Sequence, residues 1–169
     1  MNLILRWYYD ASFAAHKDCK SHTGGLLTLG KGVITATSRK QQLNTRSSTE
    51  AELVAADDAM VPILWTRNFL QAQGLKIEDN VLYQDNKSTI LLEKNGKASS
   101  SKRTRHLNIR FFFITDQVQQ GHLRIEYCPT DDMIADYFTK PLTGHKFHQF
   151  RTLIMNLPKP QCEDTGDNK

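Results

Sequence analysis

Four acidic residues stand in separate short contexts along the chain, and their type and placement suit catalysis. They are Asp10, Glu50, Asp85 and Asp136. Asp10 and Asp85 each end an apolar, strand-like run, where an unpaired carboxylate would be costly to bury, whereas the other two fall in helix-like segments. Carboxylates gathered at one end of a sheet would offer the oxygen ligands that Mg²⁺ prefers, completed by a substrate phosphate. The pattern therefore indicates a metal-dependent nuclease.

Two of these assignments have close competitors. Glu50 and Glu52 differ by about 200° around a helix, so only one of them can face a common site. The apolar residues that follow favour Glu50 and make Glu52 a solvated neighbour. Asp136 competes with Asp131 and Asp132, whose charges could instead stabilise the start of a helix.

Alternation and turn signals predict the strands that must position these acids. Glycines in the segment 30–32 supply the positive φ of a tight hairpin turn. The expected strands cover residues 4–10, 24–29, 33–38, 80–84 and 123–127. The first three are expected to pair in antiparallel fashion.

The longest predicted helix runs from Ser47 or Ser48 to about Gln73. Ser47 and Glu50 have the spacing of a capping box, and Pro62 predicts a kink or a break near Val61. Further helices are expected over 86–94, 107–120, 131–139 and 146–157. The order β-β-β-α-β-α-α-β-α-α predicts an α/β fold with a mixed sheet and helices packed against it.

Bulk properties place the chain among ordinary globular domains. Its 169 residues fit one domain, expected over 1–157, followed by a polar tail over 158–169 that we expect to be disordered. No stretch approaches the roughly 20 apolar residues of a membrane helix. The three cysteines lie far apart and are odd in number, which disfavours a disulfide framework and suits a reducing compartment.

The net charge of +4 is modest, but the basic residues are unevenly distributed. The segment 99–110 holds four basic residues and no acid. These residues are Lys102, Arg103, Arg105 and Arg110. A basic stripe beside a carboxylate cluster is the layout that a polyanion-cutting enzyme requires. The alternative for such a run taken alone is a solvated loop.

Five short motifs, in order and at consistent spacing, narrow the class of protein. They are Lys-Ser-His-Thr-Gly-Gly at 20–25, Ser-Ser-Thr-Glu-Ala-Glu-Leu at 47–53, Gln-Asp-Asn-Lys-Ser at 84–88, Arg-His-Leu-Asn-Ile-Arg at 105–110 and Ala-Asp-Tyr-Phe-Thr-Lys-Pro-Leu at 135–142. Together they resemble the ribonuclease H domain of Pol polyproteins from copia-type long-terminal-repeat retrotransposons. The match runs from about residue 8 to residue 157.

The resemblance implies a ribonuclease H-like fold, with a five-stranded mixed sheet flanked by helices. The implied activity is endonucleolytic hydrolysis of the RNA strand of RNA–DNA hybrids during reverse transcription, leaving 5′-phosphate and 3′-hydroxyl ends. Two Mg²⁺ ions, replaceable by Mn²⁺, would be held by Asp10, Glu50, Asp85 and Asp136, and the family position favours Asp136 over its neighbours. The implied partner is a reverse transcriptase domain upstream in the polyprotein, in the cytoplasm within a virus-like particle or in the nucleus, with no membrane contact.

Hybrid duplexes are recognised by groove shape, 2′-hydroxyls and phosphates more than by sequence. The candidates for 2′-hydroxyl and phosphate contacts are Asn44, Thr45, Arg46, Ser47, Ser48 and Asn86. Lys102, Arg103, Arg105 and Arg110 are candidates for the phosphates of the DNA strand. Many ribonucleases H carry a mobile histidine in the loop before the last helix, but the loop 128–132 has none.

Other features receive less specific interpretations. His16, Cys19 and His22 share a spacing that invites a zinc site, but three nearby ligands without a fourth do not make a structural site. The run 111–113 of three phenylalanines is expected in the core, and Cys128 is expected to be a buried structural thiol. The alternative function is a catalytically silent ribonuclease H-like module that binds nucleic acid or scaffolds a polymerase, although all four acids are present. The sequence contexts of the acids in this chain disfavour an integrase or transposase core.

Overall fold

The computed structural model describes residues 2–95 and 105–158. Five strands form one sheet in the order β3-β2-β1-β4-β5. Their bounds are β1 (Asn2–Ser12), β2 (His22–Thr28), β3 (Thr35–Lys40), β4 (Lys76–Gln84) and β5 (Arg124–Tyr127). β1, β2 and β3 are antiparallel, whereas β4 runs parallel to β1 and β5 runs parallel to β4. The predicted five-stranded mixed sheet is therefore confirmed.

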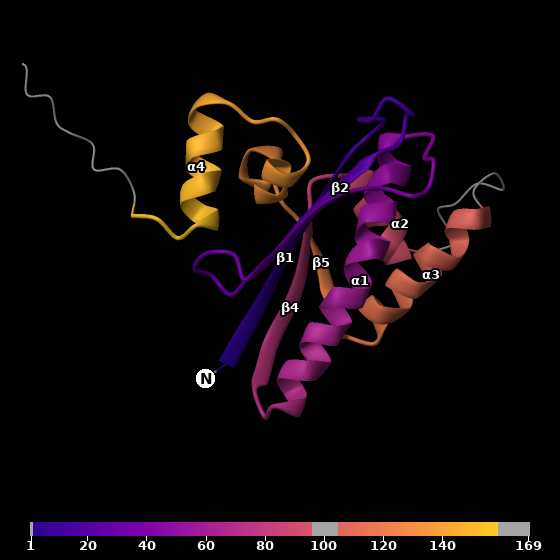
Figure 1. The fold of residues 1–169 in the computed structure, drawn as a ribbon. Helices are drawn as coiled ribbons and strands as arrows, with labels where there is room; N and C mark the ends of the chain where they lie inside the picture. The colour runs from indigo at the N-terminus through magenta and orange to yellow at the C-terminus, as the bar shows by residue number, and fades with distance from the viewer. Residues whose placement is uncertain (1, 96–104, 159–169) are drawn as a thin grey trace, which may run out of the picture.

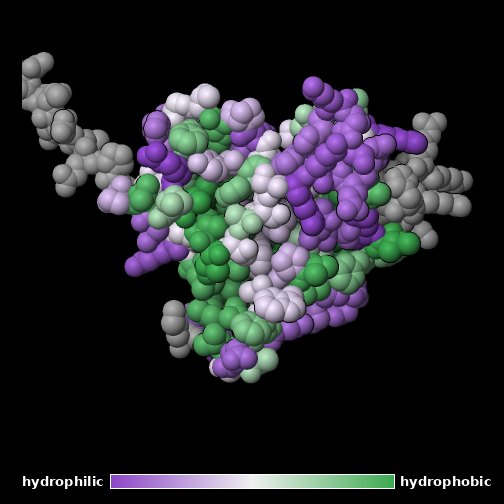
Figure 2. All heavy atoms as spheres, in the orientation of Figure 1, coloured by the Kyte–Doolittle hydropathy of each residue, from purple (hydrophilic) through white to green (hydrophobic). Residues whose placement is uncertain are grey.

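Helices cover the two faces of this sheet unequally (Figure 1). α1 (Ser48–Ala72), α2 (Lys87–Asn95) and α3 (Arg105–Gln119) lie together on one side. α4 (Gly144–Ile154) and two short 3₁₀ helices, η3 (Thr130–Asp132) and η4 (Ile134–Phe138), lie on the other. Apolar surface remains visible along the sheet between α4 and α1 in Figure 2, so the smaller layer covers less of its face.

The central strand β1 explains how the chain assembles. Its alternate side chains Leu5, Trp7 and Tyr9 are buried in the main core, where they join Leu53 and other residues of α1. Because parallel strands end at the same edge of a sheet, β1 and β4 deliver the residues that follow them to one place. Tyr8 is in register with Tyr83, so the ends of these two strands lie side by side.

α1 begins as the sequence predicts but does not break at its proline. The Ser47 side chain accepts a hydrogen bond from the Glu50 N–H at 3.2 Å, and Glu50 Oε2 accepts one at 2.7 Å from the N–H of Arg46, the residue before the cap, in a variant of the capping box. The helix then runs unbroken through Pro62. The predicted break is wrong because buried residues on both sides of Pro62 pack on the sheet, and this packing outweighs one lost hydrogen bond.

Two further predictions are wrong in detail. The segment 131–139 forms two short 3₁₀ helices in place of one α-helix. Of the three consecutive phenylalanines, only Phe111 is buried; Phe112 and Phe113 are 48% and 40% exposed. The reason is helical geometry, since adjacent residues on α3 point about 100° apart and cannot all face the core.

None of the described helices is long and apolar enough to cross a bilayer. The expected disordered tail lies outside the described residues from position 159 onward. The domain boundary at 157 therefore stays a prediction.

Helix α2 carries a buried carboxyl group that lies against the sheet. Glu93 is fully buried, and its Oε2 lies 2.8 Å from the side-chain amide of Gln84 on β4. Burial raises the pKa of Glu93 to about 8, against the opposing effects of Gln84 and Lys94. Glu93 is therefore neutral near neutral pH.

The Glu93→Gln variant is expected to be more stable than the wild type at high pH. The folded-state pKa lies above the unfolded one, so the wild type is favoured below the unfolded pKa and loses stability as pH rises toward about 8. The difference in the free energy of unfolding between the variant and the wild type should grow by at most about 1.4 kcal/mol per pH unit in that window. Urea unfolding at pH 5, 6.5 and 8 measures it, and parallel pH profiles would contradict the buried neutral acid.

Candidate active site

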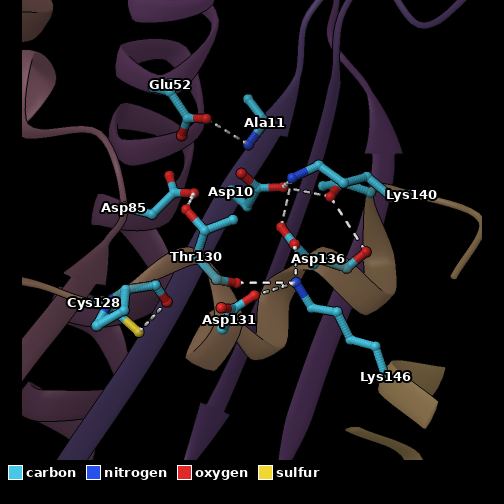
Figure 3. Close-up of polar contacts among 12 residues, drawn as sticks. Asp10, Ala11, Glu52, Asp85, Cys128, Thr130, Asp131, Asp136, Lys140 and Lys146 are labelled. Atoms are coloured by element: carbon cyan, nitrogen blue, oxygen red, sulfur yellow. Dashed lines mark hydrogen bonds and ion pairs between the residues drawn. The ribbon is translucent and has the colours of Figure 1, made fainter. Parts of the chain in front are cut away.

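Three carboxylates from separate elements meet where β1 and β4 end (Figure 3). Asp10 lies near the end of β1, Glu52 lies in the first turns of α1, and Asp85 directly follows β4. One oxygen from each lies within 4.8 Å of the other two. Within residues 2–95 and 105–158, this is the group of three His, Cys, Asp or Glu side chains with such spacing. The structure thus brings Asp10 and Asp85 together, as the sequence suggested.

The third acid is Glu52, so the prediction that Glu50 faces the site and Glu52 faces solvent is wrong. Glu52 is 4% exposed, and its Oε1 accepts a hydrogen bond from the Ala11 N–H at 3.2 Å. Glu50 instead turns back to the helix start, where it accepts a hydrogen bond from the N–H of Arg46, the residue before the Ser47 cap. A glutamate at the third helical position is recruited by the helix start, which leaves the one two residues later free to enter the site. The capping-box spacing was the sequence signal for this division.

The burial and crowding of these acids are compatible with a bound cation. Burial raises the pKa of Asp10, against the opposing effects of Lys140 and Thr139. Burial, followed by the charges of Asp10 and Asp85, raises the pKa of Glu52 well above its usual value. Glu52 Oε2 is buried and has no hydrogen-bond partner within residues 2–95 and 105–158, and an orphaned buried acceptor is costly. A divalent cation would satisfy that oxygen and offset the crowded negative charge, so the donor set fits a hard metal ion.

Lys140 links Asp136, the fourth predicted acid, to Asp10. Asp136, on η4, is 2% exposed. Lys140 Nζ lies 2.7 Å from Asp136 Oδ1 and 3.5 Å from Asp10 Oδ2, so the ammonium group stands between the two carboxylates. Burial opposes the charge of Lys140, but Asp10 and Asp136 outweigh it and raise the pKa of this lysine. Asp131, a competitor for the role of Asp136, has a fully exposed side chain.

Several polar groups around the acids have roles that the sequence analysis did not assign. Thr139 Oγ1 donates a hydrogen bond to Asp10, and Thr130 Oγ1 donates one to Asp85 at 3.0 Å. Lys146 Nζ lies 3.2 Å from Asp136 Oδ2 and donates to the Thr130 carbonyl at 3.1 Å. Thr139 and Lys140 belong to the motif at 135–142, which was a signal for them, whereas Thr130 and Lys146 become visible only in the fold.

Most of the predicted nucleic-acid contacts have other partners or lie in the open. The Asn86 side chain caps α2 by accepting from the N–H groups of Ser88 and Thr89 at 3.0 and 3.1 Å. The Ser47 side chain caps α1, and Thr45 Oγ1 bonds to Ser21 Oγ at 2.8 Å. Their predicted contacts with substrate would have to use other atoms or add to these bonds.

The remaining candidates for nucleic-acid contacts are paired, exposed or outside the described residues. Arg110 is paired with Asp57 of α1 at 2.5 Å, so its charge is already engaged. Asn44, Arg46 and Ser48 are exposed beside the start of α1. Lys102 and Arg103 lie outside the described residues, as does the side chain of Arg105.

Two cysteine predictions have a clear outcome. Cys128 is 6% exposed, and burial raises the pKa of its thiol to about 11, so it is the buried thiol that was expected. His16 and His22 do contact each other, but exposed Cys19 does not join them in a three-ligand cluster.

Solved structures show which class of fold this is. The chain is similar to LC11-RNase H1 from compost, with a TM-score of 0.57 and 14% identity over 79% of this chain and 90% of that one. It is also similar to the RNase H domain of PFV, with a TM-score of 0.54 and 14% identity over 93% of each chain. The chain therefore has the ribonuclease H fold.

Sequence relatives identify the particular source of this fold. The chain is 35% identical over 152 residues to the retrovirus-related Pol polyprotein from transposon TNT 1-94 of Nicotiana tabacum. It is 36% identical over 154 residues to that from transposon RE1 of Arabidopsis thaliana. These matches cover 89% and 90% of this chain but only 11% and 10% of the polyproteins. No protein-family model matches the chain. The chain is a homologue of one segment of retrovirus-related Pol polyproteins from copia-type transposons, as the motifs suggested.

Proposed function

We propose that this domain hydrolyses the RNA strand of RNA–DNA hybrids, with Mg²⁺ as its cofactor, during retrotransposon reverse transcription. The observation that carries the proposal is the cluster of buried Asp10, buried Glu52 and half-buried Asp85, in which Glu52 Oε2 has no hydrogen-bond partner among the described residues. Such a set is unfavourable in a purely structural role, since burial raises the pKa values of Asp10 and Glu52 and leaves one Glu52 oxygen without a described partner.

Known proteins support the substrate class. The neighbour LC11-RNase H1 has also been solved in complex with an RNA/DNA hybrid, and that structure has a TM-score of 0.53 to this chain. The relatives are Pol polyproteins, which suits a domain working beside a reverse transcriptase. We propose the same partner here.

The metal ligands follow from the site. Asp10, Glu52 and Asp85 would hold one cation, and Asp10 with Asp136 would hold a second. When bound, such ions activate water and stabilise the charge that develops on a phosphodiester during hydrolysis, leaving 5′-phosphate and 3′-hydroxyl products. Glu52 replaces the predicted Glu50 in this set.

The residues around the acids have supporting roles. Thr139 and Thr130 fix the orientations of Asp10 and Asp85 through their hydroxyl groups. Lys140 and Lys146 balance the charge of Asp136 and present N–H donors on the side of the site where a phosphate would approach. We further propose that exposed Asn44, Arg46 and Ser48, together with the basic segment of Lys102, Arg103 and Arg105, contact the hybrid backbone.

The test is cleavage of an end-labelled RNA–DNA hybrid in Mg²⁺, in Mn²⁺ and in EDTA, beside duplex RNA and duplex DNA. We expect cutting only of the RNA strand of the hybrid, only with a divalent metal, and with 5′-phosphate ends. Absence of cutting by folded protein that still binds the hybrid would overturn the proposal in favour of a silent binding module.

A further inference from the structure

A chain of three side-chain hydrogen bonds leads from the loop after β1 to the segment that carries Asp136. His16 Nε2 lies 3.0 Å from His22 Nδ1, and His22 Nε2 lies 2.8 Å from Ser38 Oγ. Ser38 Oγ donates to the Phe138 carbonyl at 2.7 Å. Phe138 is the last residue of η4 and lies two positions after Asp136. None of these four residues belongs to the acid cluster.

The Phe138 carbonyl, at the end of this series, fixes the direction of the other hydrogen bonds. A carbonyl oxygen can only accept, so Ser38 gives its single hydroxyl proton to Phe138. The Ser38 oxygen must then accept from His22 Nε2–H, which leaves His22 Nδ1 as an acceptor for His16 Nε2–H. Burial and the neighbouring His16 lower the pKa of His22, in keeping with a neutral ring. His22 is therefore the Nε2–H tautomer, and His16 carries a proton on Nε2.

Ser38, in this series of hydrogen bonds, belongs to a row of paired residues that crosses β1, β2 and β3. Asp10 on β1 is paired with Gly24 on β2, and Gly24 is paired with Ser38 on β3. The end of η4 lies across this row: Thr139 bonds to Asp10 at one end, and Phe138 bonds to Ser38 at the other.

Gly24 in the middle of the row allows this close approach. A Cβ atom there would lie 2.6 Å from Thr139 Cγ2 and 2.9 Å from the backbone carbon of Phe138. These distances are too short for any side chain, so η4 rests directly on the backbone of β2. Its position along that contact is set by the polar bonds at the two ends.

We propose that Ser38, oriented by His22 and His16, is a positioning residue that holds η4 in the place where Asp136, Thr139 and Lys140 meet Asp10. The proposal rests on the proposed function only for its effect on catalysis. The bond at Asp10 belongs to the site itself, whereas the bond at Ser38 is the independent anchor at the far end. Loss of that anchor lets η4 shift while the acid triad on β1, α1 and β4 stays in place.

Imidazole ¹⁵N chemical shifts of the full chain test the order of the hydrogen bonds. We expect His22 to be protonated at Nε2 and not at Nδ1 at pH 7.5, and His16 to carry a proton at Nε2. A His22 ring protonated at Nδ1 would overturn the proposed order of the hydrogen bonds. The Ser38→Ala variant should disturb the His22 resonances, whereas removal of the exposed hydroxyl at the other end of β3, in Thr35→Ala, should not.

Amide exchange and kinetics test the positioning role. In Ser38→Ala, exchange of the Thr139 and Lys140 N–H groups, which both bond to the Asp136 carbonyl, should accelerate about 10-fold. The kcat should fall about 10-fold with KM within about twofold, the size of loss typical of outer partners of a metal site. Ser38→Thr and His22→Gln keep a hydroxyl and an Nε2–H donor, and they should restore both quantities. Thr35→Ala should change neither.

The outcomes separate this inference from the proposed function. If the wild type does not cut hybrids, the proposed function fails, and the exchange rates of Thr139 and Lys140 still decide whether Ser38 anchors η4. If the wild type cuts but Ser38→Ala keeps wild-type exchange and kcat, the positioning role is overturned. A loss of kcat that Ser38→Thr does not restore would also overturn it, because that result points to general disruption of β3.

Discussion

The Glu52→Gln variant is expected to lose hybrid cleavage by more than about 100-fold, whereas Glu50→Gln keeps it within about twofold. Loss of an outer partner of a metal site costs about 10–100-fold, and loss of a direct ligand should cost more. Glu52 is the buried member of the cluster with an orphaned oxygen. Glu50 bonds only to the helix start. The two residues are the same type, two positions apart, so each variant is the control for the other.

The same pair should show opposite effects on stability. Without metal, the raised pKa of Glu52 means that the wild type loses stability as pH rises above the ordinary carboxyl range, and Gln removes that penalty. Gln can still accept from the Ala11 N–H at Oε1. Glu52→Gln should therefore melt above the wild type at pH 8 in EDTA. Glu50→Gln weakens a cap bond and should lose about 0.5–1 kcal/mol.

Thermal melts with and without Mg²⁺ complete this test. Mg²⁺ should raise the Tm of the wild type and of Glu50→Gln, because it binds only the folded state, and it should raise the Tm of Glu52→Gln much less. Cleavage lost in Glu50→Gln and kept in Glu52→Gln would reverse the assignment and return Glu50 to the site.

The Asp10→Asn variant is expected to abolish cleavage while the fold stays intact. Asp10 is the acid that touches both halves of the site: it belongs to the triad and also faces Lys140 and Thr139. Asn keeps the shape and an oxygen for Thr139, and Lys140 keeps its 2.7 Å partner Asp136. The loss should exceed about 100-fold, as for Glu52, because no other carboxylate can join the two groups.

The matched control is Asp131→Asn, which removes an acid from a fully exposed side chain on the same side of the molecule. It should cut at a rate within about twofold of the wild type, since surface charges are screened by solvent. Circular dichroism and the melting curve report whether each variant is folded. Unchanged cleavage by folded Asp10→Asn would remove this residue from the site and with it the proposed metal centre.

Local sequence rules predicted the framework of this site well. Apolar runs ending in acids located Asp10 and Asp85, and parallel pairing of the two strands explains their meeting. The error at Glu50 came from the helix face and the family motif, although the spacing of Glu50 from Ser47 already indicated a role for that side chain at the helix start. The order of strands and helices predicted an α/β fold with a mixed sheet, and the five motifs supplied the resemblance to ribonuclease H.

Other parts of the site depend on contacts that no local rule contains. Ser38 and Phe138 are 100 positions apart, and Thr139 and Asp10 are 129 apart. Segments of 3₁₀ helix such as η4 lack the long periodic pattern that predicts α-helices. The positions of Thr130 and Lys146 likewise follow from tertiary packing of η3 and α4 onto the sheet.

The ammonium group of Lys140 lies between Asp10 and Asp136 and changes how the proposed second metal position would be filled. Any dication that binds there must expel a tethered monocation, so loading is an ion exchange and not a simple association. The charge within that pocket then changes by only one unit, and the chain keeps the displaced competitor nearby at high effective concentration. The position between Asp10 and Asp136 should therefore fill after the triad of Asp10, Glu52 and Asp85, and at higher metal concentration.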